Sequence, residues 1–440
     1  MIERLASLLA DFSGQNLYLK ISPDVLDFTS KESTPELHFF FPDGRDINLV
    51  INEANLPQVL SLLKISVFSK NMKILTWDWK NLASFALGKT KKSYLVDGAI
   101  IDLKIIESYA GRKFKPPKSF NEAMNRLKDL MTTGIWKEIE PVYKKLHLPL
   151  LTRTIPHLET TGLVCTQTGG MVYANYEIDG QENGRLRCSG AFQQGFVPHA
   201  MTPELRESLT PRSHNELFML FDFRGQEVFM LAWMSQDKEL LELCAAPDIY
   251  LALYEKITGK KAEKSDVARN LAKKIFLPVI YGQSAYMLSQ RCGFSQPVAE
   301  EIIQRIDTLF PAVSAFIESY QKQLQEHGYA KDIFGKRRSF EEGKEYSVRN
   351  FAVQSPSAVV CLEKLNHLYF ALREKTDLAY TVHDGYAVYA TKENWQTIFK
   401  IGVDVLSGES EFCPGLKLKV SVKAGRNLNN LKSIARKGEI

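Results

Sequence analysis

Residues 380–390 read YTVHDGYAVYA, an apolar segment that His383 and Asp384 interrupt. Apolar residues on both sides of a polar pair are typical of buried strands, here with a turn at the pair. A carboxylate held among buried residues costs several kcal/mol unless a partner compensates its charge. Asp384 therefore requires a partner, and a metal ion that it shares with a second carboxylate is one candidate.

A second carboxylate of the same kind is Asp222, in the segment FMLFDFRGQEVFMLAWMSQDKEL (218–240). It ends an apolar run that predicts a buried strand, and a helix is expected directly after it. Two divalent ions held between Asp222 and Asp384 would orient a nucleophile and a leaving group for phosphoryl transfer. An aspartate at a strand end is also common for purely structural reasons, so the pair alone leaves both interpretations open.

The segment KKAEKSDVARNLAKKIFLPVIYGQSA (260–285) predicts a basic helix between the two aspartates. Arg269 and Lys273 are spaced i, i+4 and share one helix face, with Tyr281 two turns beyond Lys273. A basic helix is usually a solvated surface. A helix that presents Arg and Lys together and ends in an aromatic residue and a glycine also suits a nucleoside triphosphate.

Together these three segments resemble the family A DNA polymerases, the group of bacterial DNA polymerase I and many phage replicases. The matching residues are Asp222 and Glu227 for motif A, Arg269, Lys273, Tyr281 and Gly282 for motif B, and His383 and Asp384 for motif C. Shorter segments resemble the family in the same order, namely NGRLRCSGAFQQGFVP, DIFGKRRSF, RNFAVQSPSA and KLKVSVKAGRNL. The resemblance extends over residues 147–432.

The resemblance implies an α/β (α+β) fold of the right-hand polymerase type, with an antiparallel palm sheet and helical fingers. It also implies an N-terminal RNase H-like domain of the exonuclease type. The expected divisions are residues 1–112 for a degenerate 3′–5′ exonuclease-like domain, 113–200 for a helical linker and vestigial thumb region, and 201–440 for palm and fingers. The fingers are expected at 237–330.

The family's mechanism gives each matching residue an expected role. Asp222, Asp384 and the carbonyl oxygen of Phe223 would bind two Mg²⁺ ions, and Lys273 would contact the α-phosphate and protonate the leaving pyrophosphate. Asp222, Asp384 and Lys273 are therefore the expected catalytic residues. Those expected to bind the deoxynucleoside triphosphate (dNTP) are Arg269, Lys273, Glu227, Leu277 and Tyr281, of which Glu227 would exclude a 2′-hydroxyl. The residues expected at the DNA are Arg185, Lys336, Arg337, Arg338, Gln354 and His383, with a solvated surface cluster as the alternative for the basic ones.

The N-terminal segment departs from the family. A proofreading site needs several carboxylates around two metal ions, including an Asp-x-Glu pair on the first strand. The predicted first strand NLYLKI (16–21) has no carboxylate, and Lys80 stands where another ligand is expected. Asp102, in the apolar run GAIIDLKII (98–106), cannot hold the ions alone. We therefore predict no proofreading.

A second departure concerns the thumb. In the family a long helical thumb follows the segment that PHLETTGL (156–163) resembles, whereas here a short stretch leads from it to ENGRLRCSG (182–190). Because the thumb wraps the duplex, we predict fewer phosphate contacts, faster dissociation and low processivity. An accessory processivity protein or self-association would then hold the DNA primer-template.

Composition and cysteine spacing agree with these expectations but do not require them. Hydrophobic residues make up 45% of the chain, and the net charge of +5 permits a nucleic-acid partner. The six cysteines include no CxxC pair, so we expect reduced thiols in the cytoplasm of a bacterium or of a phage-infected host. No apolar run reaches the ~18 residues of a membrane span, so no membrane association is expected.

Two other functions stay open. One is a related single-subunit RNA polymerase, and Glu227 argues against it. The other is a catalytically weak or inactive replisome subunit that binds DNA. The presence of Asp222, Lys273 and Asp384 together argues against the second.

Overall fold

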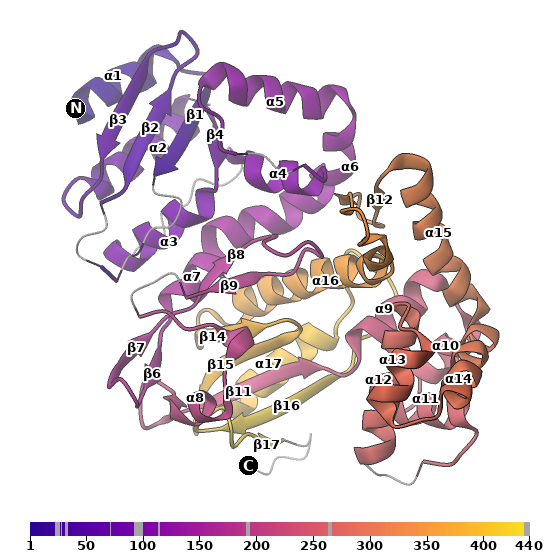
Figure 1. The fold of residues 1–440 in the computed structure, drawn as a ribbon. Coiled ribbons are helices and arrows are strands. Elements are labelled where there is room, and N and C mark those ends of the chain that lie inside the picture. Colours follow the sequence, from indigo (N-terminus) through magenta and orange to yellow (C-terminus); the bar gives the residue numbers. More distant parts are fainter. Residues whose placement is uncertain are drawn as a thin grey trace.

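The computed structural model describes residues 1–22, 27, 29–30, 34–70, 72–91, 100–112, 115–190, 194–262 and 266–434. All candidate site residues fall in these ranges. Parts of some segments and boundaries discussed above lie outside them, namely residues 98–99, 113–114, 191–193 and 263–265. Figure 1 shows an N-terminal domain in indigo and purple, a sheet with its helices in magenta and yellow, and a group of red and orange helices to one side. Within the described ranges, no helix combines the length and the apolar character that crossing a bilayer requires.

Five strands form a mixed sheet in the N-terminal domain. Its order is β3 (Asp46–Val50), β2 (Glu36–Phe40), β1 (Asn16–Ser22), β4 (Lys73–Trp77) and β5 (Ile100–Asp102), with the first three antiparallel and β4 and β5 added in parallel. The helices of this domain are α1 (Ile2–Asp11), α2 (Leu56–Lys70), α3 (Trp79–Thr90) and α4 (Leu103–Tyr109). Leu17, Tyr18 and Leu19 of β1 are all buried, so protein covers both faces of the sheet. This architecture agrees with the RNase H-like domain expected there.

The apolar run around Asp102 contains the end of a strand and the start of a helix. Of the residues that the structure describes in this run, Ile100–Asp102 are extended, and α4 begins at Leu103. Asp102 stops the strand because its side chain accepts the backbone N–H of Lys104 and so caps the first turn of α4.

The segment between the two sheets starts with helices and continues with short strands. The helices are α5 (Phe120–Thr132), α6 (Ile135–Val142) and α7 (Ile155–Thr160), with π-helical turns at Tyr143–His147 and Leu150–Thr154. The strands are β6 (Leu163–Cys165), β7 (Gly170–Val172), β8 (Asn175–Glu177), β9 (Arg187–Ser189) and β10 (Leu209–Thr210), with α8 (Pro203–Ser208) before the last of them. β8 and β9 form an antiparallel hairpin, which we call the β8–β9 hairpin (residues 175–189).

The palm sheet is antiparallel and has the order β14 (Leu378–Val382), β15 (Gly385–Thr391), β11 (Glu216–Phe223), β16 (Val420–Gly425) and β17 (Lys432–Ser433). α17 (Trp395–Ser407) packs on β11, β15 and β16. A Cβ atom on Gly402 would lie only 2.3 Å from the Phe221 ring, so glycine allows this close approach of helix and sheet. α16 (Val348–Leu372) packs in turn on α17.

The fingers are helical, as the resemblance implies. They contain α9 (Gln226–Ser235), α10 (Lys238–Cys244), α11 (Ile249–Thr258), α12 (Asp266–Ile280), α13 (Ala285–Cys292), α14 (Gln296–Leu309) and α15 (Pro311–His327). The side chains of Asp237, Asp248 and Ser284 cap α10, α11 and α13. β12 (Ala330–Lys331) and β13 (Arg337–Arg338) form a second hairpin that leads back to α16.

Candidate active site

Asp222 and Asp384 lie at the same end of the palm sheet. Asp222 is on β11, opposite Gly385 of β15, and Asp384 is the residue just before Gly385 in the turn from β14. A Cβ atom on Gly385, the residue after Asp384, would lie 3.6 Å from a carboxylate oxygen of Asp222, and the charge of Asp222 acts on Asp384. Both line one cleft of about 270 Å³, together with His383. The chain thus brings together two carboxylates that are 162 positions apart.

Neither acid has an ordinary electrostatic environment. Burial, and then repulsion by Asp222, raises the pKa of Asp384 to about 6. Desolvation also raises the pKa of Asp222, and the cations of Lys423, Lys273 and Arg269 oppose that rise. Two carboxylates that destabilise each other's charge are a favourable environment for a cation.

These residues fit a divalent metal ion. Carboxylate oxygens are the donors that Mg²⁺ prefers, and the side chain of Asp222 is open to solvent. Over the described part of the chain, no three His, Cys, Asp or Glu side chains gather in the manner of a complete metal site. The two aspartates would therefore need a backbone carbonyl such as that of Phe223, water and phosphate oxygens to complete the coordination, which is how Mg²⁺ is commonly held.

The basic face of α12 points toward the two acids. Desolvation and the neighbouring Arg269 lower the pKa of Lys273, while Asp222 and Asp384 oppose this effect. The Nζ atom of Lys273 lies 5.0 Å from the ring centroid of Tyr250, and Arg269 Nε donates to Asp248 at 2.8 Å. The sequence did not single out Asp248, although an aspartate directly before a predicted helix was a visible signal for a capping residue.

Glu227 is the centre of a hydrogen-bonded group at the end of α12. Its carboxylate accepts hydrogen bonds from the Tyr281 hydroxyl and the Arg185 guanidinium. Arg185 lies in the loop of the β8–β9 hairpin, where Asn183 also donates to the side-chain oxygen of Gln354 at 3.0 Å. Four of these residues were expected near the nucleotide or the DNA, whereas Asn183 was not. Leu277, one turn before Tyr281, is half-buried.

His383 has a left-handed backbone, with φ of 53°, in the turn before Gly385. Its ring lies 4.7 Å from the ring of His199, a residue that the sequence did not single out. Partial burial, assisted by Arg185 and His199, lowers the pKa of His383 to about 4. The imidazole is therefore neutral at pH 7, and a contact with a phosphate there would be a neutral hydrogen bond rather than an ion pair.

The basic residues after β12 are all paired. Arg337 contacts Glu138 at 3.2 Å, and Arg338 contacts Glu182. Lys336 is buried and forms an ion pair with Asp179. Lys336 thus lies in the protein interior with its ammonium group paired, and the DNA contacts of Lys336, Arg337 and Arg338 stay predictions.

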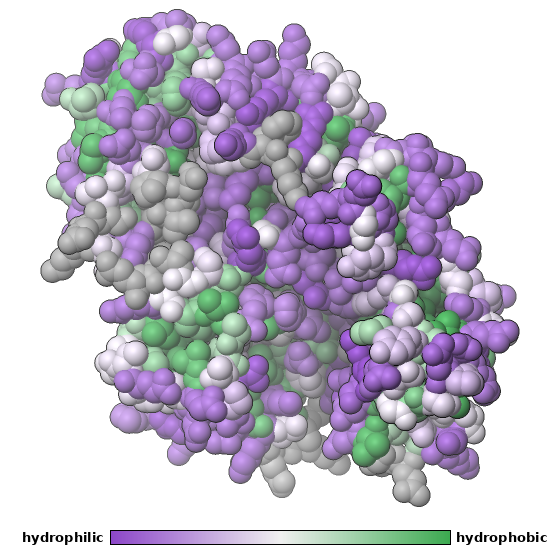
Figure 2. Space-filling model, viewed as in Figure 1, coloured by the Kyte–Doolittle hydropathy of each residue, from purple (hydrophilic) through white to green (hydrophobic). Residues whose placement is uncertain are grey.

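Figure 2 shows that hydrophilic residues dominate this face of the molecule, also around the hollow between the N-terminal domain, the palm and the fingers. A polar hollow of this kind suits a charged partner better than an apolar one.

Comparisons with known proteins point to one family. The model of the family "DNA polymerase family A" matches residues 125–430. The chain is 25% identical over 326 residues to DNA polymerase I of Chloroflexus aurantiacus and 27% identical over 306 residues to the thermostable DNA polymerase I of Thermus aquaticus. These matches cover 69% and 65% of this chain but only 34% and 36% of those proteins, so the chain spans about a third of their length.

The fold is also that of a solved polymerase. The POL domain of Pol1 from M. smegmatis, solved in complex with DNA primer-template and dNTP, superposes with a TM-score of 0.69 at 14% identity. The superposition covers 97% of this chain and 98% of that one. Because the family model matches more than half of the residues of this chain, the chain belongs to DNA polymerase family A.

Proposed function

We propose that this chain is a DNA-templated DNA polymerase that transfers nucleotides from dNTPs to the 3′-hydroxyl of a primer by a two-metal mechanism. The observation that carries the proposal is the meeting of Asp222 on β11 with Asp384 in the β14–β15 turn, near Arg269 and Lys273 of α12. The related Pol1 domain was solved with primer-template and dNTP, which supports the same class of ligands here.

Each residue has a role that its surroundings support. Asp222 and Asp384 would hold two Mg²⁺ ions, which supply charge neutralisation and a lower pKa of the attacking hydroxyl when bound. Lys273 and Arg269 would bind the triphosphate, because both are cationic and share one helix face. The lowered pKa of Lys273 suits it to donate a proton to the leaving pyrophosphate.

Glu227 would select the sugar. Its carboxylate is held by Tyr281 and Arg185, so it has a defined position from which it would exclude a 2′-hydroxyl. Gln354, held by Asn183, would test the minor groove, where every base pair presents an acceptor. The residues that would contact the DNA are Arg185, Arg337, Arg338 and His383. The buried Lys336 would instead hold the β12–β13 hairpin in place through its ion pair with Asp179.

The experiment that tests this proposal is primer extension with Mg²⁺, comparing dNTPs with ribonucleoside triphosphates and the wild type with Asp384→Asn. Extension by dNTPs that Asp384→Asn abolishes is the expected result. Extension by ribonucleotides alone would favour the RNA polymerase. DNA binding without extension by either set would favour an inactive replisome subunit.

We also propose that the N-terminal domain does not proofread. β1 has no carboxylate, and the Asp102 side chain is fully buried and already accepts three backbone N–H groups, so a metal ion has no access to it from solvent. A primer with a mismatched 3′ end should therefore stay intact in the presence of Mg²⁺. If the primer were degraded, if chelation of Mg²⁺ stopped the degradation and if Asp102→Ala did not, the protein would have a nuclease site elsewhere.

Low processivity, with an accessory protein or self-association that holds the DNA, is part of the same proposal. The helices α5 to α7 run directly into the short strands β6 and β7, in the place where the family has its thumb. Under single-encounter conditions with a trap, we expect the chain alone to add few nucleotides. Addition of hundreds of nucleotides in one encounter would contradict this. The cytoplasmic location stays a prediction.

A further inference from the structure

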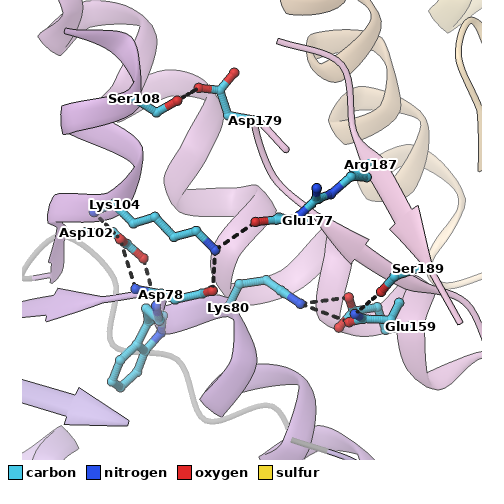
Figure 3. Close-up of polar contacts among 12 residues, drawn as sticks. Asp78, Lys80, Asp102, Lys104, Ser108, Glu159, Glu177, Asp179, Arg187 and Ser189 are labelled. Carbon is cyan, nitrogen blue, oxygen red and sulfur yellow. Dashed lines mark hydrogen bonds and ion pairs between the residues drawn. The ribbon is translucent and has the colours of Figure 1, made fainter. Parts of the chain in front are cut away.

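The β8–β9 hairpin and α7 pack against the N-terminal domain at the carboxyl ends of β4 and β5 (Figure 3). Lys80 of α3 extends from this edge into the rest of the protein (Figure 3). Its Nζ atom lies 2.9 Å from Glu159 of α7 and 3.3 Å from the side-chain oxygen of Asn175 in β8. Lys80 is only 4% exposed and Glu159 is fully buried. An ammonium buried in this way has a defined position, since losing Glu159 would leave its charge uncompensated and losing Asn175 would remove a hydrogen bond.

Glu159 and Asn175 carry this contact further into the hairpin. Glu159 also accepts the backbone N–H of Tyr176 at 2.7 Å, and Asn175 donates to Ser189 on the opposite strand at 2.9 Å. One lysine of the N-terminal domain therefore holds both strands of the β8–β9 hairpin, directly or through one intermediate.

A second cation repeats the arrangement. Lys104 of α4 lies 2.7 Å from Asp78 and 3.2 Å from Glu177 of β8, and Glu177 also binds Arg187 of β9 (Figure 3). Just beyond β8, the carboxylate of Asp179 accepts a hydrogen bond from Ser108 of α4. These contacts belong to the same edge of the N-terminal domain, so the root of the hairpin is fixed at several points.

The tip of the same hairpin reaches the nucleotide site. Arg185 binds Glu227, and Asn183 binds Gln354, as described above. The hairpin is short, with its strands at 175–177 and 187–189, so a shift of its root displaces its tip. Displacements of ~1 Å at groups that position a substrate can cost up to ~10²-fold in rate.

We propose that Lys80 is a positioning residue through which the N-terminal domain sets the sugar selectivity of the polymerase site. It fixes the β8–β9 hairpin, the hairpin fixes Arg185, and Arg185 fixes the carboxylate of Glu227. This inference rests on the proposed function for its activity readout. The mechanical link from Lys80 to the hairpin does not, and it is tested separately.

The test compares two lysines of α3. The first variant is Lys80→Met with Glu159→Gln, which removes both buried charges and keeps an oxygen for the Tyr176 N–H. Replacing both partners avoids the unpaired charge that a single substitution would leave. The matched control is Lys89→Met, because Lys89 binds Ser30 and Glu53 within the N-terminal domain and does not touch the hairpin.

Two measurements decide the outcome. We expect hydrogen exchange of residues 175–189 to become faster in the double variant and to stay unchanged in Lys89→Met. We expect the preference for dNTPs over ribonucleotides in primer extension to fall about tenfold in the double variant only. The thermal midpoints of the two variants show whether both are folded.

The outcomes separate the two proposals. Faster exchange with unchanged selectivity would overturn the positioning role, as would equal effects of both variants. Unchanged exchange would overturn the link itself. A wild type that extends no primer would refute the proposed function, while the exchange experiment would still test the link. Arg185→Ala should reproduce the loss of selectivity, and adding it to the double variant should cause little further loss.

Discussion

Asp102→Ala should destabilise the N-terminal domain, and the size of the effect should grow as the pH falls. The Asp102 side chain is fully buried and accepts the backbone N–H groups of Asp78 at 3.1 Å, Trp79 at 2.7 Å and Lys104 at 3.0 Å. It therefore joins the end of β4 to the beginnings of α3 and α4. Alanine would leave all three donors without an acceptor.

The magnitude follows from two opposing terms. Buried donors without an acceptor cost ~1–3 kcal/mol each, so three of them give ~3–9 kcal/mol. Burial, with repulsion by Asp78, raises the pKa of Asp102 from 3.8 to about 6. Keeping this group ionised at pH 8 therefore costs ~3 kcal/mol, which alanine removes. The net loss of unfolding free energy at pH 8 is centred on ~3 kcal/mol.

The pH dependence has a definite sign. The folded protein binds a proton at Asp102 more tightly than the unfolded chain, so this group contributes most stability at low pH and loses it as the pH rises through about 6. Between pH 8 and pH 5 the wild type should gain ~1.4 kcal/mol from Asp102, and the variant should not. The difference between the two proteins should widen by that amount.

Urea unfolding at pH 8 and pH 5, with and without Mg²⁺, measures both quantities. The control is Asp43→Ala, because Asp43 is exposed and the backbone N–H of Arg45 lowers its pKa, so its contribution to stability should stay constant between pH 8 and pH 5. If the difference for Asp102→Ala narrowed at pH 5, or changed on addition of Mg²⁺, Asp102 would be an ionised metal ligand and our assignment of it as a structural acceptor would be wrong.

Three further predictions concern the polymerase site. Asp384→Asn should lower the rate of primer extension by at least ~10³-fold, since it removes one of two metal-binding carboxylates, while fluorescence anisotropy should show DNA affinity retained; near-normal extension would contradict the assignment. Arg269→Met should raise the KM for dNTP about tenfold or more with a smaller change in kcat, which steady-state kinetics would show, and a change in kcat alone would be inconsistent with triphosphate binding. Arg338→Met should reduce the slope of log affinity for DNA against log salt concentration by ~1. Lys336→Met should leave that slope unchanged but lower the free energy of unfolding by ~3–5 kcal/mol, because it breaks a buried ion pair. A smaller slope for Lys336→Met would show that Lys336 contacts the DNA.

The palm and the fingers were predictable because their signals are local. An apolar run ending in Asp222 or Asp384 predicts a buried strand with its acid at the end, and the structure has β11 and β14 there. The i, i+4 spacing of Arg269 and Lys273 fixes a common helix face regardless of what the helix packs against. The antiparallel pairing that brings the two acids together came only through the family resemblance.

Long-range polar partners could not be predicted in this way. Asp179 binds Lys336 from 157 positions away, and Lys80 meets Glu159 only because two domains pack together. Each of these residues is an ordinary charge in the sequence, and the pattern around it does not name its partner. Lys336 was therefore grouped with Arg337 and Arg338, although burial separates it from both. The end of β5 at Asp102 has a local cause, because the Asp102 side chain caps the first turn of α4.

The two sheets show that an aspartate at a strand end is not by itself a metal ligand. Asp102 and Asp222 both stand at or near the end of a strand, and desolvation raises the pKa of each. Their oxygens differ in what they contact. Those of Asp102 are used by three backbone N–H groups inside the protein, whereas Asp222 lines an open cleft opposite a second acid and below two cations. A cation can stabilise the carboxylates of Asp222 and Asp384 but has no access to that of Asp102. The end of the palm sheet can therefore bind a metal ion, whereas Asp102 at the end of β5 has a structural role.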